Sequence, residues 1–255
     1  MGNFTTFEIK DHVAYITLNR PEKRNAINRA MRKELQEAYA RVKTDREIWA
    51  VIMTGNGEAF SSGRDLSELE RPGNDDGSVM TTDELCFVQR FIYKPIVVAL
   101  NGPCLAQAAG MAENADIVIF SERASIGWPH VKRGITSVSG PSFLANAIPW
   151  NQAMAVLMRG RSISASQALQ LGMANEVVPH DQLSSAAERW VREILENAPL
   201  AVQAIKEAAR RGQELHVMDR VYLARSILNR MLLTEDAREG LLAFKEKRKP
   251  VWKGM

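Results

Sequence analysis

Short apolar runs, separated by turn residues and amphipathic segments, predict an α/β chain. Runs of this length that are rich in Val and Ile and bounded by Gly, Pro or Asn are typical of strands. The expected strands cover residues 7–9, 13–18, 49–54, 95–100, 117–120 and 175–178. The first two flank Lys10-Asp11-His12 and are expected to form a hairpin.

Helical periodicity is clearest after Asn28, a residue type that favours the position preceding a helix. The apolar stripe consists of Ile27, Met31, Leu35, Ala38 and Val42, and the basic positions are Arg29, Arg32, Lys33, Arg41 and Lys43. Further helices are expected at 82–93, 152–158, 165–171, 183–196, 200–211, 214–233 and 235–247, with a break at Pro149. Strand and helix alternate until Ala198-Pro199, which predicts a core at 1–198 and a helical region at 199–255.

Two turns rich in small residues follow expected strands. One is Ser62-Gly63-Arg64, and the other leads through Ala106 and Gln107 into a run of Ala and Gly. Backbone N–H groups at such turns and at helix starts lack partners within the helix and can receive an oxyanion. The two turns together predict a two-donor oxyanion hole. A tight strand–helix–strand crossover that binds nothing is the alternative.

Composition narrows the class of protein. The 255 residues are 45% hydrophobic and 25% charged, with a formal net charge of +3, as in an ordinary globular protein. No apolar run reaches the roughly 18–20 residues of a membrane span, and the N-terminal segment lacks a signal-peptide core. Cys86 and Cys104 have neither metal nor redox spacing, so a cytoplasmic protein without a metal is expected. The dispersed positive charge suits an anionic small molecule better than nucleic acid.

The polar stretch 71–82 is a candidate lid.

Six stretches, in this order and spacing, resemble the crotonase superfamily, the enoyl-CoA hydratase/isomerase family. They are ITLNRPEKRNAIN at 16–28, VIMTGNGEAFSSGRDLSEL at 51–69, KPIVVALNGPCLAQAAGMAENADIVIF at 94–120, IGWPHVKRGI at 126–135, ALQLGMANEVVP at 168–179 and EDAREGLLAFKEKRKP at 235–250. The resemblance implies an α/β fold with a ββα-spiral core and a C-terminal helical trimerisation region. It also implies homotrimers or hexamers, and acyl-CoA substrates with coenzyme A as part of the substrate and no other cofactor.

The resemblance assigns roles to particular residues. It implies that the backbone N–H groups of Arg64 and Gln107 hold the thioester oxygen, with Gln107 replacing a glycine of the family pattern. The implied substrate- and CoA-binding positions are Lys23, Arg24, Ser62, Gly63, Asp65, Gly110, Trp128 and Lys247. Among these, the three cations are expected to bind CoA phosphates, and Asp65 is expected to fix the turn after Gly63.

The chain departs from the family where proton transfer is expected. Hydratases of the family carry two glutamates, and those positions hold Gly110 and His130 here. His130 is therefore the leading candidate for a general acid/base, since an imidazole titrates near pH 6.5 without any special shift. Glu113, one turn along the same helix from Gly110, is a candidate replacement carboxylate. Ser137 and Ser139 lie where some relatives carry an extra acid.

Three readings of function stay open at this point. The first is an acyl-CoA enzyme that performs hydration or isomerisation with His130. The second is a carbon–carbon bond hydrolase of the β-diketone type, some of which also have a histidine after the Gly-x-Pro turn. The third is a catalytically lapsed relative that binds CoA, or RNA through the basic helix at 29–43. The sequence does not identify the acyl group or distinguish trimer from hexamer.

Overall fold

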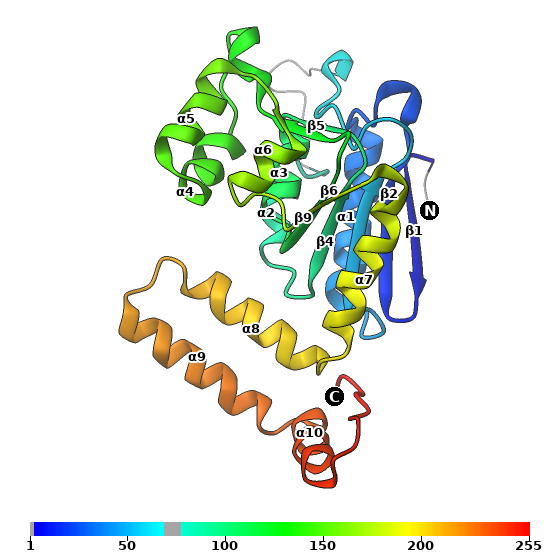
Figure 1. The fold of residues 1–255 in the computed structure, drawn as a ribbon, viewed down its shortest axis with the longest axis vertical. Helices are drawn as coiled ribbons and strands as arrows, with labels where there is room; N and C mark the ends of the chain where they lie inside the picture. Colours follow the sequence, from blue (N-terminus) through cyan, green and yellow to red (C-terminus); the bar gives the residue numbers. More distant parts are fainter. Residues whose placement is uncertain (1–2, 69–77) are drawn as a thin grey trace.

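The computed structural model describes residues 3–68 and 78–255. The candidate lid at 71–82 falls largely outside the described residues. Within them, the chain builds a mixed α/β body from which three C-terminal helices extend (Figure 1).

A six-stranded sheet forms the centre of the body, in the order β1-β2-β3-β4-β6-β9. Its strands are β1 (Thr5–Lys10), β2 (Val13–Leu18), β3 (Ala50–Gly55), β4 (Ile96–Leu100), β6 (Ile117–Ser121) and β9 (Glu176–Val178). The hairpin β1–β2 is antiparallel, with Lys10 opposite Val13, and every later pairing in this sheet is parallel. The six strands predicted from the apolar runs are all present.

Both faces of this sheet are covered, which explains the uninterrupted apolar run of β4. Ile96, Val98 and Leu100 point into a core shared with helix α1 (Arg29–Thr44). Val97 and Ala99 point to the other face, into a core shared with α7 (Leu183–Leu195). Asn28 caps α1 as predicted, since its side chain accepts the N–H of Met31 at 2.8 Å.

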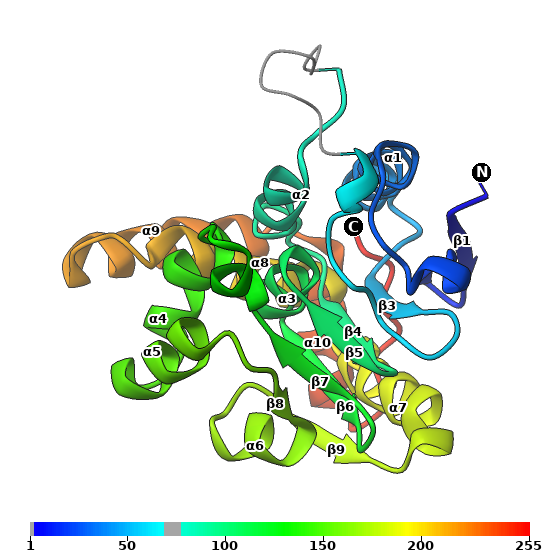
Figure 2. The same cartoon turned by 90° about the horizontal axis from the view of Figure 1, so that it is seen from above.

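A second, three-stranded sheet carries the segments that the sequence singles out. It contains β5 (Pro103–Leu105), β7 (Ser125–Gly127) and β8 (Ile163–Ser164), and β5 and β7 are parallel. The short helices α2 (Thr82–Gln89) and α3 (Gln107–Glu113) lie side by side near this sheet (Figure 2). The chain then forms a π-helical turn at Gly140–Leu144, α4 (Ala145–Ala147), α5 (Trp150–Arg159) and α6 (Ala165–Gln170).

Two helix boundaries differ from the prediction by three residues or more. The expected helix at 82–93 ends at Gln89, where the N–H of the following Arg90 bonds back to Phe87 and Val88. The expected helix at 214–233 begins only at Val217, with His216 in extended conformation before it. Neither boundary carries a proline or glycine that marks it locally.

The C-terminal helices are α8 (Pro199–Gly212), α9 (Val217–Met231) and α10 (Glu235–Glu246). They extend away from the sheet, with α8 and α9 side by side (Figure 1). Lys206 joins α8 to the core, donating to the carbonyl oxygen of Lys94 at 3.0 Å and pairing with Asp116. The division into a core at 1–198 and a region at 199–255 stays a prediction. Among the described residues, no helix is long and apolar enough to cross a membrane.

Candidate active site

The two small-residue turns lie against each other. Gly63 has φ +91°, and a Cβ atom there would lie 2.7 Å from Cβ of Ala106 and 2.8 Å from the carbonyl oxygen of Leu105. No real Cβ atom tolerates such contacts, so only glycine allows both this conformation and this approach. The same hypothetical atom would lie 3.5 Å from the backbone nitrogen of Gln107. The fold therefore brings together the two segments that the sequence pairs.

Within the part of the chain that the structure describes, the backbone N–H groups of Arg64 and Gln107 have no acceptor at this junction. Ile27 bonds to the carbonyl oxygen of Gly63 at 2.8 Å, and Asp65 donates to the carbonyl oxygen of Ile27 at 3.0 Å. Arg64, between these two bonds, directs its N–H the other way because alternate residues of an extended segment face opposite sides. Gln107 is the first residue of α3 and no side chain caps that helix. Within the described residues, neither N–H has an acceptor.

Ala106 introduces strain into the second turn. It adopts φ 56° and ψ −125°, a region that glycine occupies readily and other residues avoid. The N–H of Ala106 donates to Gly127 at 2.9 Å, and the N–H of Leu105 donates to Ser61 at 2.9 Å. These bonds fix the backbone that leads into the strained residue. Strain of this kind typically costs about 1–3 kcal/mol and persists where the surroundings enforce it.

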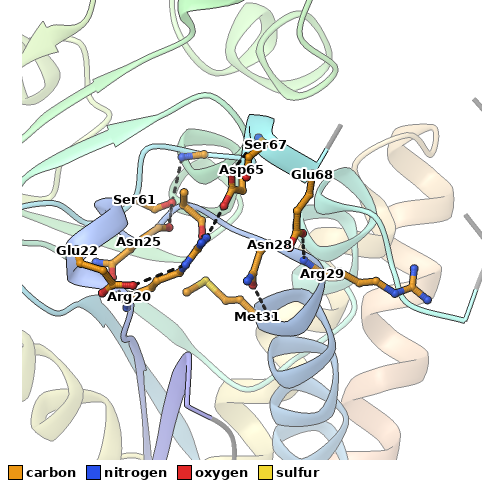
Figure 3. A network of polar contacts seen from close by, with 12 residues as sticks. Arg20, Glu22, Asn25, Asn28, Arg29, Met31, Ser61, Asp65, Ser67 and Glu68 are labelled. Carbon is orange, nitrogen blue, oxygen red and sulfur yellow. Dashed lines mark hydrogen bonds and ion pairs between the residues drawn. The ribbon is translucent and has the colours of Figure 1, made fainter. Parts of the chain in front are cut away.

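A polar network holds the first turn (Figure 3). Arg20 pairs with the carboxylate of Asp65, which also accepts the N–H and the hydroxyl of Ser67 at 3.0 and 2.7 Å. Ser61 donates its hydroxyl to the carbonyl oxygen of Asn25 at 2.7 Å. The hydrogen bonds from Arg20 and Ser67 lower the pKa of Asp65 to about 2. The carboxylate of Asp65 is therefore held in a paired network directly after Gly63.

Ser139 fills the space beside Gly110. Position 110 is the one at which the resemblance places the first glutamate of the family. A Cβ atom at Gly110 would lie 2.6 Å from Cβ of Ser139 and 3.3 Å from Sγ of Cys86. The indole N–H of Trp128 donates to the hydroxyl of Ser139 at 3.1 Å and holds it in place. Trp128 itself is only 1% exposed, so it packs beneath the site. This packing excludes a larger side chain at position 110.

The segment that carries His130 follows β7 at the same edge of the small sheet at which the second turn follows β5. Leu105 at the end of β5 pairs with Gly127 at the end of β7, and the two strands are parallel. Gln107 follows the first by two residues and His130 follows the second by three. The imidazole is 7% exposed, and neither ring nitrogen has a hydrogen-bond partner among the described residues. Burial, with a smaller contribution from Arg133, lowers the pKa of His130 and favours the neutral base.

Glu113 lies at the far end of α3 from Gln107. Six residues at 1.5 Å each separate their backbones by about 9 Å. Both carboxylate oxygens are buried without a partner among the described residues, although the residue as a whole is partly exposed. Burial raises the pKa of Glu113 to about 9, against an opposing effect of Arg90. Glu113 lines a cavity of about 230 Å³ together with apolar residues such as Leu144 and Met173.

The proposed CoA-binding cations fall into two groups. Lys23 and Arg24 are exposed beside the first turn, where the carbonyl oxygen of Arg24 accepts the N–H of the half-buried Ser62 at 2.9 Å. Lys247 is exposed after α10, at the opposite end of the molecule (Figure 1). One chain therefore does not bring Lys247 together with Arg24.

The basic helix of the RNA-binding reading is not an open row of cations. Arg32 is 4% exposed and donates to the carbonyl oxygen of Met80 at 3.2 Å. Arg41 pairs with Asp45 and lies over the ring of Phe7. These contacts tie the helix to neighbouring segments of the same chain.

Sequence analysis missed one carboxylate near these turns, Asp83. It lies in the first turn of α2, and its Oδ1 atom is buried without a partner among the described residues. The available signal was its spacing of three residues from Cys86, which places both on one face of the helix.

Comparison with known sequences and structures places the chain in the crotonase superfamily. The sequence profile described as enoyl-CoA hydratase/isomerase matches residues 8–255. The chain therefore belongs to the enoyl-CoA hydratase/isomerase family.

Individual relatives match over nearly the full chain. The (E)-benzylidenesuccinyl-CoA hydratase of Thauera aromatica is 34% identical over 252 residues, covering 98% of both chains. The mevalonyl-coenzyme A hydratase of Aspergillus fumigatus is 36% identical over 251 residues, covering 95% of this chain and 92% of that one. A solved enoyl-CoA hydratase/isomerase from Mycobacterium paratuberculosis superimposes with a TM-score of 0.91 at 33% identity, covering 99% of both.

Proposed function

We propose that the chain is an acyl-CoA enzyme in which the N–H groups of Arg64 and Gln107 bind the thioester oxygen and His130 transfers the proton. The observation that carries the proposal is the pair of N–H groups, without an acceptor among the described residues, at the contact between Gly63 and Ala106. The names of the relatives, hydratases of CoA thioesters, support addition of water to an enoyl-CoA.

The chemistry follows from the charge that develops on the thioester oxygen. Two fixed N–H donors stabilise an enolate there, and loss of one such donor typically costs about 3–4 kcal/mol in the transition state. Water must also lose a proton as its oxygen bonds to the β-carbon. A neutral imidazole is the form that accepts this proton, and burial of His130 favours that form.

Binding of the CoA portion is assigned to the exposed cations. Lys23 and Arg24 lie beside the first turn and attract phosphate by charge. Lys247 requires a neighbouring copy of the chain to reach the same ligand, and we propose a homotrimer or a hexamer. Large exposed apolar side chains on the C-terminal helices support such an assembly; they are Val217, Met218, Val221, Tyr222, Leu228, Leu232, Leu233, Leu241, Leu242 and Phe244. Light scattering of the purified protein measures its size.

Mass spectrometry on a panel of enoyl-, β-ketoacyl- and aryl-CoA thioesters and cyclic β-diketones tests the reaction. Gain of one water by an intact enoyl thioester is the expected result, and isomerisation is followed by chromatography. Release of free CoA, or opening of a diketone ring, would show that the reaction is a hydrolysis and not the proposed hydration. Binding of thioesters without any conversion would replace the enzyme by a CoA-binding protein.

A further inference from the structure

The helix α2 presents one face to the beginning of α3, where the second turn of the site lies. Sγ of Cys86 lies 3.3 Å from the carbonyl oxygen of Gln107 and 3.2 Å from that of Thr82 in its own helix, and it also lies beside Gly110. Asp83 precedes Cys86 by three residues and so lies on the same face, one turn nearer the start of the helix. The N-terminal half of α2 is thereby fixed against the beginning of α3.

Asp83 also interacts with the first turn. Burial raises the pKa of the Asp83 carboxyl, the Arg64 guanidinium opposes part of that rise, and Glu84 adds to it. Oδ1 of Asp83 is buried and has no hydrogen-bond partner among the described residues. A buried carboxyl oxygen without a partner is costly, and use by a ligand or a reaction is one of the reasons for which natural proteins retain such a group.

Its neighbour Glu84 behaves in the opposite way. Glu84 is exposed and accepts the N–H of Thr81 at 2.6 Å, while the hydroxyl of Thr81 accepts the N–H of Glu84 at 3.2 Å. This reciprocal cap accounts for Glu84 as a helix-starting residue. Asp83 takes no part in the cap; its place in the first turn suits the helix dipole, which does not account for its buried Oδ1 atom.

We propose that Asp83 is the second proton-transfer group of the site, supplying the carboxyl function that the glutamates at positions 110 and 130 supply in other members of the family. This inference rests on the proposed function, because it assumes a thioester held between Arg64 and Gln107. Asp83 lies at neither of the two family positions, 110 and 130, that carry the glutamates.

The proposed step balances in protons and electrons. The oxygen of water bonds to the β-carbon, its proton passes to the His130 imidazole, and the electrons of the C=C bond move to form the enolate. The enolate then collapses as the α-carbon takes the proton of the Asp83 carboxyl, leaving Asp83 ionised and His130 protonated. Proton exchange with solvent restores both groups. In the reverse direction the Asp83 carboxylate removes the α-proton.

Exchange of the α-protons in heavy water isolates this step from water addition. The full-length protein is incubated in heavy water with a saturated acyl-CoA whose acyl chain matches the enoyl thioester that it converts, and deuterium uptake is followed by mass spectrometry. Asp83→Asn is expected to lower the exchange rate about 100-fold or more, with affinity for the thioester unchanged. His130→Asn is expected to lower the rate of water addition about 10³-fold while exchange persists. Glu84→Gln removes the adjacent charge, keeps the cap, and is expected to match wild type in both assays.

Three outcomes would overturn the inference. Wild-type exchange and hydration rates in Asp83→Asn would exclude Asp83 alone and leave the proposed function intact. A parallel loss of thioester affinity and rate in Asp83→Asn would assign the residue to binding. A wild-type protein that exchanges no α-proton and converts no thioester would overturn both the inference and the proposed function. Circular dichroism and urea unfolding of each variant separate these outcomes from misfolding.

Discussion

The polar groups beneath the first turn and the buried titratable groups around α2, α3 and His130 have opposite surroundings. Arg20, Asp65 and Ser61 are paired with one another or with backbone groups. His130 and Glu113 have no partner for their buried polar atoms within the described residues. Paired groups fix the backbone, whereas a buried polar group without a partner costs stability unless a ligand satisfies it. The first region is therefore a scaffold, whereas the second contains the candidates for proton transfer.

Removal of the His130 imidazole is expected to cause the largest change of all, and the change is in the rate of water addition. His130→Asn should lower the rate of water addition about 10³-fold, the middle of the range for general acid–base groups, while the free energy of unfolding stays the same or rises. Rate and urea unfolding are measured on the same preparation.

His180 is the matched control, because its Nδ1 lies 3.0 Å from the hydroxyl of Ser121. His180→Asn should lose some stability and keep its activity. An His130→Asn variant with full activity would refute the role of the imidazole.

Breaking the scaffold should affect stability most. Asp65→Asn leaves Arg20 without its charged partner and is expected to lower the free energy of unfolding by about 2–3 kcal/mol. Because the folded-state pKa of Asp65 is lowered to about 2, this stabilisation is present above the unfolded-state pKa and is lost as the pH falls toward 2.

The exposed pair of Arg189 with Glu176 provides the comparison. Arg189→Met should cost less than about 1 kcal/mol, as surface ion pairs generally do. Equal losses in the two variants would remove the distinction between the scaffold and the surface.

Glu113 tests whether every unpartnered group is part of the reaction. Its folded-state pKa is about 9, whereas an unfolded chain releases this proton near the ordinary value of 4.5. Between these values the folded state binds more protons, so stability falls as the pH rises. Glu113→Gln should remove this dependence and raise the free energy of unfolding by about 1–3 kcal/mol near neutral pH, with activity unchanged. A large loss of activity would instead make Glu113 the replacement carboxylate.

Relief of strain in the second turn is expected to give the smallest change. Ala106→Gly should raise the free energy of unfolding by about 1 kcal/mol, because glycine adopts φ 56° and ψ −125° without a steric penalty. Ala108→Gly, inside α3, should instead lower it by about 1 kcal/mol. A stability loss at both positions by urea unfolding would show that the conformation of Ala106 carries no strain.

The sequence predicts what local patterns determine. Asn28 and the apolar stripe specify α1 and its start, and the buried run at 95–100 specifies a central strand. The end of α2 at Gln89 was missed because contacts with the rest of the fold, not a local breaker residue, determine it.

Prediction of the site follows the same division. Gly63 and Gln107 come from the family pattern, and the structure shows why a glycine is required at the first position. Asp83 escaped notice because its importance depends on how α2 packs against α3. Lys247 poses a related problem, since one chain leaves it far from Arg24 (Figure 1).

The central claim is that an oxyanion site with His130 in place of the usual glutamate performs water addition. The most direct measurement compares wild type, His130→Asn and His180→Asn for gain of one water on the enoyl-CoA panel, by mass spectrometry under identical conditions. The account predicts conversion by wild type and His180→Asn, and a loss of about 10³-fold in His130→Asn. Equal conversion by all three proteins would contradict it.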